Sequence, residues 1–174
     1  MSSSLTPRSQ ALLWTIPSIL HPECRDIYVE ELRRRAGSAK VFTNTHPVRI
    51  HEAARLAAAL PDMRFVLVKR TLEDNMLRIY MRKYGRGNAY GYDLKTIREH
   101  LTWYHEMMDL LAERLPDRVR IINYEDMIAD PAGALRVAAD LCGLAMRDGP
   151  LPELGDDRGC GEPYRAFMAA ALES

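Results

Sequence analysis

The chain has 174 residues, 47% hydrophobic and 28% charged, which is typical of a soluble globular domain with a real core. Lys plus Arg and Asp plus Glu number 24 each, so the net charge is zero, which argues against a protein that coats nucleic acid. No apolar run approaches the length of a membrane span. We therefore expect neither a nucleic-acid partner nor a membrane partner.

The three cysteines, Cys24, Cys142 and Cys160, are far apart and show no metal-ligand spacing, so no metal site is predicted. The N-terminus lacks the charged-then-apolar order of a secretion signal. Together with the odd cysteine count, this indicates reduced thiols and a cytoplasmic protein.

The first third of the chain predicts a short helix over residues 26–35, closed by Gly37, and a buried strand over residues 40–43. A second helix begins at Pro47, because apolar residues then recur at the helical period. This core-facing stripe consists of Ile50, Ala53, Ala54, Ala57 and Leu60. Pro61 and Asp62 end the helix.

Strands and helices then alternate along the rest of the chain. The predicted strands cover residues 65–68 and 119–123, and the predicted helices cover residues from about 71 to 84, 94–115, 130–143 and 164–172. Such alternation with short loops indicates a parallel sheet with helices on its faces. Three strands are few for such a sheet, so the domain is either trimmed or part of a larger sheet.

The strand over residues 65–68 runs straight into Lys69 and Arg70, and a helix carrying Arg78 follows. Ligands bind at the carboxyl ends of parallel strands, and the free N–H groups of a helix N-terminus favour anions. The pattern therefore suggests a phosphate or sulfate site. The alternative is an ordinary strand-to-helix turn with solvated cations.

The order of these motifs resembles the sulfotransferases that use 3′-phosphoadenosine 5′-phosphosulfate (PAPS), and most closely the bacterial branch associated with tetratricopeptide repeats. The motifs are a strand, Thr-His-Pro, a helix, a strand ending in Arg, a Tyr-Gly loop, a long helix, and a strand followed by Tyr-Glu-Asp and Asp-Pro. The resemblance implies an α/β, P-loop nucleotide-hydrolase-like fold, reduced in size, with a three-layer parallel sheet flanked by helices. It implies one domain over residues 1–174, with a divergent or truncated part at 1–39, a core at 40–144 and a tail at 145–174.

The resemblance assigns the 3′-phosphate of the cofactor to Arg70 and to the position eight residues later. That position holds Arg78 here, where the family has Ser. A second guanidinium suits an oxyanion, but it is larger than Ser and also fits an exposed helical cation. Tyr124 matches the family's Tyr near the adenine, which an aromatic face can stack upon.

His46 matches the family's catalytic base, which takes the proton of the acceptor, a task that suits an imidazole. It lies in the segment Asn44-Thr45-His46-Pro47, in which Asn44 replaces the family's Lys and removes a cation from the transferring group. The alternative is a His at a strand end that caps the next helix. The loop from Tyr84 to Asp93 resembles the loop beside the family's acceptor pocket, or else its tyrosines cover the core.

The family's N-terminal phosphate-binding loop, Pro-Arg-Ser-Gly-Thr-Thr, has no intact copy here. Only Pro7-Arg8-Ser9 remains, which makes Arg8 a candidate contact for the 5′-phosphosulfate. Three explanations stay open: a fragment, a non-catalytic member, or a compact enzyme that binds its donor differently.

The resemblance implies transfer of a sulfuryl group from PAPS to a hydroxyl or amine of a small-molecule acceptor, which leaves adenosine 3′,5′-bisphosphate. The alternative is a catalytically inactive relative that binds a nucleotide or a protein partner. A homodimer or partner subunit would cover the open edge of the sheet.

Overall fold

The structure is a computed structural model that describes residues 22–37, 39, 41–45, 47–82, 84, 88–146 and 149–173. Residues 1–63 and residues 64–174 form two compact units. The single sulfotransferase-like domain over residues 1–174 stays a prediction.

The first unit contains the helix α2 (Pro22–Ala36), the short 3₁₀ helix η2 (Pro47–Glu52) and the helix α3 (Ala53–Ala59). The first predicted helix is confirmed, although α2 starts earlier. It ends before Gly37, whose φ of 55° lies in the left-handed region that glycine adopts readily. The Nε atom of Arg25 donates to the main-chain oxygen of Ala59 at 2.8 Å and so ties α2 to the end of α3.

The predicted strand over residues 40–43 was wrong. Residues 41–43 have no regular structure, Val41 and Phe42 are 40% and 45% exposed, and Lys40 lies outside the described residues. A strand needs a neighbour for its N–H and C=O groups. Within the described ranges, the sheet has two strands, which pair with each other.

The helix predicted from Pro47 is present in two pieces, η2 and α3. Ile50, Ala53 and Ala57 of the predicted stripe are buried, and Leu56 is buried as well. Ala54 is exposed, so the stripe is shifted by part of a turn from the prediction.

The second unit is built around the parallel strands β1 (Phe65–Lys69) and β2 (Val119–Asn123), which confirms both predicted strands. Their register runs from the pair Phe65–Val119 to the pair Lys69–Asn123. The helices α4 (Leu72–Tyr80) and α5 (Leu94–Arg114) connect them, and η3 (Ala89–Tyr92) precedes α5. The result is a mixed α/β structure, mostly helical, around a small parallel sheet.

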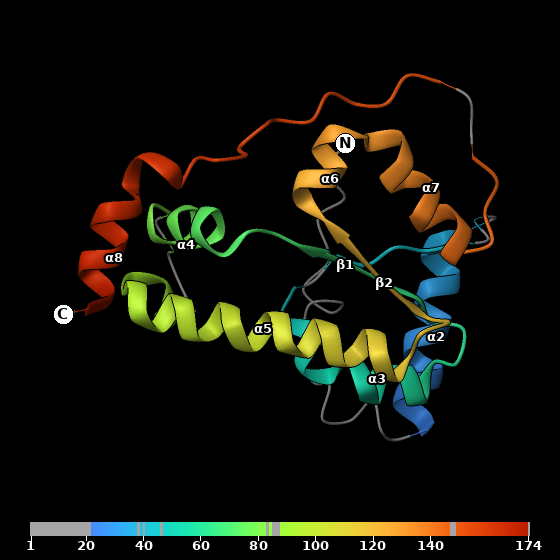
Figure 1. Cartoon of the computed structure of the whole chain (residues 1–174). Helices are drawn as coiled ribbons and strands as arrows, with labels where there is room; N and C mark the ends of the chain where they lie inside the picture. The colour runs from blue at the N-terminus through green and yellow to red at the C-terminus, as the bar shows by residue number, and fades with distance from the viewer. Residues whose placement is uncertain are drawn as a thin grey trace. The chain divides into compact units, whose positions relative to one another are not determined.

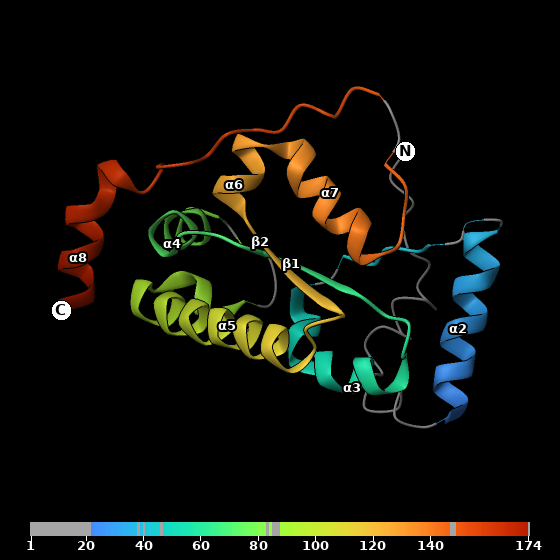
Figure 2. The ribbon, with the colours of Figure 1, turned by 45° about the vertical axis from the view of Figure 1, so that its right-hand side comes forward.

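Helices lie on both sides of this sheet. In both views α5 is on one side, and α6 (Tyr124–Ala129) and α7 (Pro131–Leu141) are on the other (Figures 1 and 2). Side chains cap two of the helices: Asp93 accepts from the N–H of Thr96, and Asp130 accepts from the N–H of Gly133. The sequence did not predict α6, and α4 ends at Tyr80 rather than near residue 84.

The core of the second unit joins α4, α5 and the C-terminal helix α8 (Arg165–Glu173), which follows η4 (Glu162–Tyr164). Its buried members are Met76, Leu77, Leu94, Ile97, Leu101 and Met168. Because α8 packs here, the chain that leads to it runs past α6 to the first turn of α4, where Gly159 and Gly161 contact Asp74 (Figure 1). That path carries the C-terminal segment across the carboxyl ends of both strands.

Val66 and Val68 of β1 remain 40% and 45% exposed. The homodimer or partner-subunit contact at the open sheet stays a prediction. No helix within the described ranges is long and apolar enough to cross a membrane.

We expect Ile97→Ala to lower the free energy of unfolding by roughly 2–5 kcal/mol, because the side chain is fully buried and its loss leaves a cavity. Chemical denaturation followed by circular dichroism measures this change. Leu110→Ala on the same helix is the control, since Leu110 is 41% exposed. Equal losses for the two variants would contradict the assigned core.

Candidate anion-binding site at the strand ends

The register of the sheet brings Arg70 and Tyr124 together. Lys69 pairs with Asn123, so the residues that follow them leave the two strands side by side. The guanidinium carbon of Arg70 lies 4.4 Å from the centroid of the Tyr124 ring, a cation–π contact. A cation and an aromatic face therefore share the edge of the sheet at which parallel α/β proteins bind ligands.

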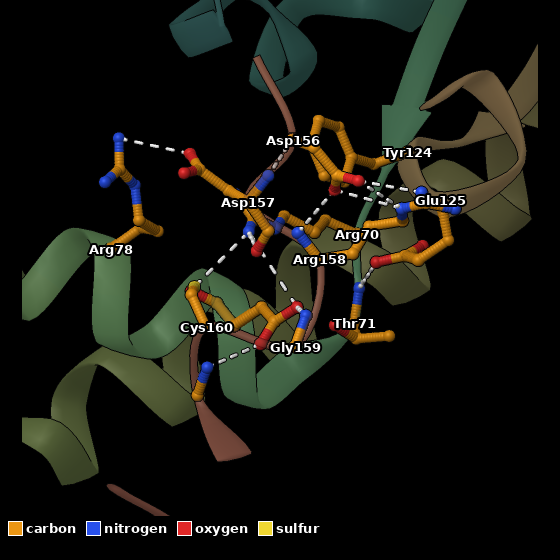
Figure 3. A network of polar contacts seen from close by, with 12 residues as sticks. Arg70, Thr71, Arg78, Tyr124, Glu125, Asp156, Asp157, Arg158, Gly159 and Cys160 are labelled. Atoms are coloured by element: carbon orange, nitrogen blue, oxygen red, sulfur yellow. Dashed lines mark hydrogen bonds and ion pairs between the residues drawn. The ribbon is translucent and has the colours of Figure 1, made fainter. Parts of the chain in front are cut away.

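The chain itself already contacts the guanidinium of Arg70 (Figure 3). Its Nη2 donates to the main-chain oxygen of Asp157 at 2.6 Å and to Sγ of Cys160 at 3.5 Å. The same nitrogen lies 3.8 Å from Oδ2 of Asp74, and the Arg70 side chain is only 14% exposed. Nε of Arg70 is buried and has no hydrogen-bond partner within the described part of the chain. A buried donor without a partner costs free energy, which a bound oxyanion would relieve.

Asp74, in the first turn of α4, is the buried carboxylate of this site, with 5% exposure. Its Oδ2 accepts from the N–H of Gly159 at 2.8 Å, and its Oδ1 accepts from the N–H of Gly161 at 2.7 Å. Burial by itself raises the pKa of this carboxyl, but the two N–H groups and the Arg70 charge outweigh burial and lower the pKa from its usual value. The carboxylate is therefore ionised in the folded protein at neutral pH.

Residues 155–161, called the strap here, complete the site. The hydroxyl of Tyr124 donates to the main-chain oxygen of Gly155 at 3.2 Å and accepts from the N–H of Asp157 at 3.1 Å. Burial, followed by the nearby Asp74 charge, raises the pKa of the Cys160 thiol. The strap is thus fixed by polar groups from both strand ends and from α4.

Arg78 lies near the C-terminal end of α4, and its side chain contacts the strap. Its Nη2 is 3.3 Å from Oδ2 of Asp157, and its side chain is 57% exposed. The two arginines that the resemblance assigns to the 3′-phosphate therefore both contact Asp157, Arg70 through the main-chain oxygen and Arg78 through the carboxylate.

Lys69 does not join the Arg70 site, because successive side chains along an extended chain point to opposite faces. Its Nζ donates to both carboxylate oxygens of Asp109 on α5, at 2.8 and 2.7 Å. Burial, followed by Lys69, lowers the pKa of the neighbouring His105, while Asp109 opposes this change. Lys69 is therefore paired with α5 rather than with the Arg70 site.

The N-terminus of α4 is also occupied by protein carboxylates. The N–H of Thr71, the residue that precedes the helix, donates to Oε1 of Glu125 at 3.0 Å. Glu125 thus braces the turn between β1 and α4. The first turn of the helix adds Glu73 and Asp74, so an incoming anion would rely on the arginines rather than on this helix end.

The remaining predicted site residues lie in the first unit. Asn44 and Thr45 are exposed and have no regular structure. His46 and Arg8 lie outside the described residues, so their roles stay predictions. No group of three or more His, Cys, Asp or Glu side chains in the described ranges has a metal-binding arrangement.

The tyrosine loop before α5 packs partly on the core. Tyr90 stacks on His100, with ring centroids 3.8 Å apart, and it contacts the core of the second unit. Tyr92 is 60% exposed, and its hydroxyl donates to the main-chain oxygen of Tyr84 at 2.6 Å. One tyrosine of the loop therefore covers the core, and another keeps an exposed side chain.

Comparison with known protein families gives a match over most of the chain. Residues 10–148, well over half of the chain, match the model of the sulfotransferase family. The chain belongs to that family. Searches of curated proteins and of solved structures found no match. In this sulfotransferase-family chain, the matched range contains Arg70, Arg78 and Tyr124, whereas the strap lies beyond it.

Sequence reasoning missed Asp74 and the strap residues that it binds. Asp74 lies between the two predicted phosphate arginines, and the strap contains the sequence Asp-Asp-Arg-Gly-Cys-Gly. Glycines beside charged residues were a signal for main-chain N–H groups that bind an anion. In this protein that anion is the carboxylate of Asp74.

We expect Asp74→Asn to make the free energy of unfolding less dependent on pH in the acid range. The folded-state pKa of Asp74 is lowered, so its carboxylate stabilises the fold fully above the unfolded-state pKa, at about pH 3.9. This stabilisation is lost as the pH falls through the folded-state pKa. Denaturation between pH 7 and pH 2 measures the profile. The control is Asp117→Asn, at an exposed turn between α5 and β2. Profiles that stay parallel for the wild type and Asp74→Asn would contradict this account.

Proposed function

We propose that this chain binds PAPS and transfers its sulfuryl group to a hydroxyl or amine of a small-molecule acceptor. The observation that carries the proposal is the contact of Arg70 with the Tyr124 ring at the carboxyl ends of β1 and β2. A guanidinium suits the 3′-phosphate, and an aromatic ring suits the adenine. Membership of the sulfotransferase family supports the same chemistry.

In this proposal Arg70 and Arg78 hold the 3′-phosphate. The buried Nε of Arg70, which has no partner in the described part of the chain, donates to a phosphate oxygen. Tyr124 keeps the guanidinium on its ring and offers the remaining ring surface to the adenine. PAPS supplies the sulfuryl group, and adenosine 3′,5′-bisphosphate remains.

The acceptor chemistry is assigned to the segment Asn44-Thr45-His46. His46 takes the proton of the acceptor hydroxyl or amine as that atom attacks sulfur. Asn44 and Thr45 contact the donor, and Arg8 contacts its 5′-phosphosulfate. These roles rest on the family resemblance of the residues.

A second candidate function is nucleotide or partner binding without catalysis. The contacts that already surround Arg70, from Asp157 and Asp74, favour this candidate, as does the Glu125 carboxylate at the start of α4. The same is true of Asn44, which stands where the family has a Lys. Binding of adenosine 3′,5′-bisphosphate without turnover on any acceptor would select it.

We expect Arg70→Ala to weaken binding of adenosine 3′,5′-bisphosphate by at least about tenfold, because a buried charge-assisted contact to phosphate contributes about 1.5–3 kcal/mol. Titration calorimetry measures the affinity, with adenosine 5′-monophosphate as the ligand control. The variant control is Arg114→Ala, an exposed arginine at the end of α5. Equal affinities for the wild type and Arg70→Ala would end the assignment of the phosphate to this site.

We expect His46→Ala to reduce turnover by about 10²–10⁴-fold while nucleotide affinity stays unchanged, which is the range for a lost general base. The measurement is transfer of ³⁵S from labelled PAPS to a panel of small hydroxyl and amine acceptors. His51→Ala is the control, because His51 is an exposed histidine in the neighbouring helix η2. Full turnover by His46→Ala would assign the proton transfer to another base.

A further inference from the structure

We propose that the strap is an internal competitor of the nucleotide: Asp157 takes the place of the 3′-phosphate between Arg70 and Arg78, and the strap must release both arginines before the nucleotide binds. This inference rests on the proposed function, because it concerns the regulation of the same site. In the closed state, the strap of the same chain blocks the site at which the donor PAPS would bind.

The contacts of Asp157 carry the first step. Its main-chain oxygen accepts from Nη2 of Arg70 at 2.6 Å, and its carboxylate lies 3.3 Å from Nη2 of Arg78. One residue therefore supplies an acceptor to each arginine, which is what a phosphate with several oxygens would do. A main-chain oxygen carries no net charge, so at Arg70 a phosphate forms the stronger bond.

The second step is that the strap is docked mainly by polar contacts. Gly161 is buried and Cys160 packs against the apolar core of the second unit, but four of the seven strap residues are exposed. Residues 155, 156, 158 and 159 are exposed. The main attachments are Asp74 with the N–H groups of Gly159 and Gly161, and the Tyr124 hydroxyl with Gly155 and Asp157. Segments with few buried apolar contacts open at low free energy. Beyond the strap, Met168 of α8 is buried in the core, so opening of the strap leaves α8 in place.

The third step is the consequence for Cys160. Its Sγ lies against Nη2 of Arg70 in the closed state, 3.5 Å away. When the phosphate displaces the strap, this thiol leaves Arg70 and Asp74 and becomes accessible. Nucleotide binding is then expected to expose a thiol, whereas a ligand that simply covers a site protects the thiols near it.

Two glycines of the strap provide matched variants. A Cβ at Gly161 would lie 3.0 Å from the main-chain carbonyl carbon of Glu73 and 3.1 Å from Oδ1 of Asp74, so Gly161→Ala crowds the strap against α4 and weakens its docking. A Cβ at Gly155 meets no atom within 4 Å, so Gly155→Ala leaves the strap docked. Neither variant changes an arginine of the site.

The first readout is calorimetric titration with adenosine 3′,5′-bisphosphate. Gly161→Ala should bind the nucleotide about tenfold more tightly than the wild type. The reason is that a larger fraction of the molecules has an open strap and can bind. Gly155→Ala should bind like the wild type, and adding Arg70→Ala to Gly161→Ala should remove the gain. Asp157→Asn is a second test that adds no atoms; it removes the charge beside Arg78 and should also tighten binding.

The second readout is the labelling rate of Cys160 by a thiol reagent, in a Cys24→Ser, Cys142→Ser background that leaves Cys160 as the one thiol. Adenosine 3′,5′-bisphosphate should accelerate labelling several-fold in the wild type, and adenosine 5′-monophosphate should not. Gly161→Ala should label faster without any nucleotide, whereas Gly155→Ala should not.

The outcomes separate the two proposals. If binding requires Arg70 but Gly161→Ala and Asp157→Asn bind no more tightly than the wild type, the strap is not a competitor and the proposed function stands. Slower Cys160 labelling on addition of the nucleotide overturns the strap proposal in the same way. If no variant binds the nucleotide, Gly161→Ala included, the proposed function fails and the role of the strap fails with it.

Discussion

The buried carboxylate of Asp74 is the interaction on which the strand-end site depends. It holds the N–H groups of Gly159 and Gly161 and lies beside Arg70, so it joins α4 to a segment more than 80 residues away. Burying a charge is costly unless hydrogen bonds and an opposite charge compensate for it. The lowered pKa of Asp74 indicates that here they do. These two hydrogen bonds attach the main chain of the strap to α4.

Arg70 is held by the fold and still has unused bonding capacity. Its charge faces Asp74 at 3.8 Å, which is longer than a good hydrogen bond, and its Nε has no partner in the described part of the chain. The guanidinium lies over the Tyr124 ring. A buried ion pair of this kind contributes little to stability. A planar guanidinium kept in position with a free donor is better explained by ligand binding than by stability alone.

The elements that sequence predicted well are those whose pattern is local. The apolar period of α5 and the apolar runs of β1 and β2 appear in the sequence, and the order of motifs brought Arg70 and Tyr124 to one edge. The strand at residues 40–43 failed because a strand depends on a neighbour that the local pattern does not report. The contact of Asp74 with the strap was out of reach for a similar reason: it uses main-chain N–H groups that are 85 and 87 residues distant.

Arg78 connects the departure from the family's sequence pattern with the strap. The family has Ser at this position, and a hydroxyl is too short to reach a segment that crosses the far side of the site. The longer Arg side chain reaches Asp157, whose main-chain oxygen meets Arg70. The substitution that sets this chain apart from ordinary cofactor geometry therefore also gives the strap its second cationic contact. Arg78 therefore contacts an internal carboxylate at the position where the proposed function requires it to contact a phosphate, and this overlap is the basis of the proposed competition.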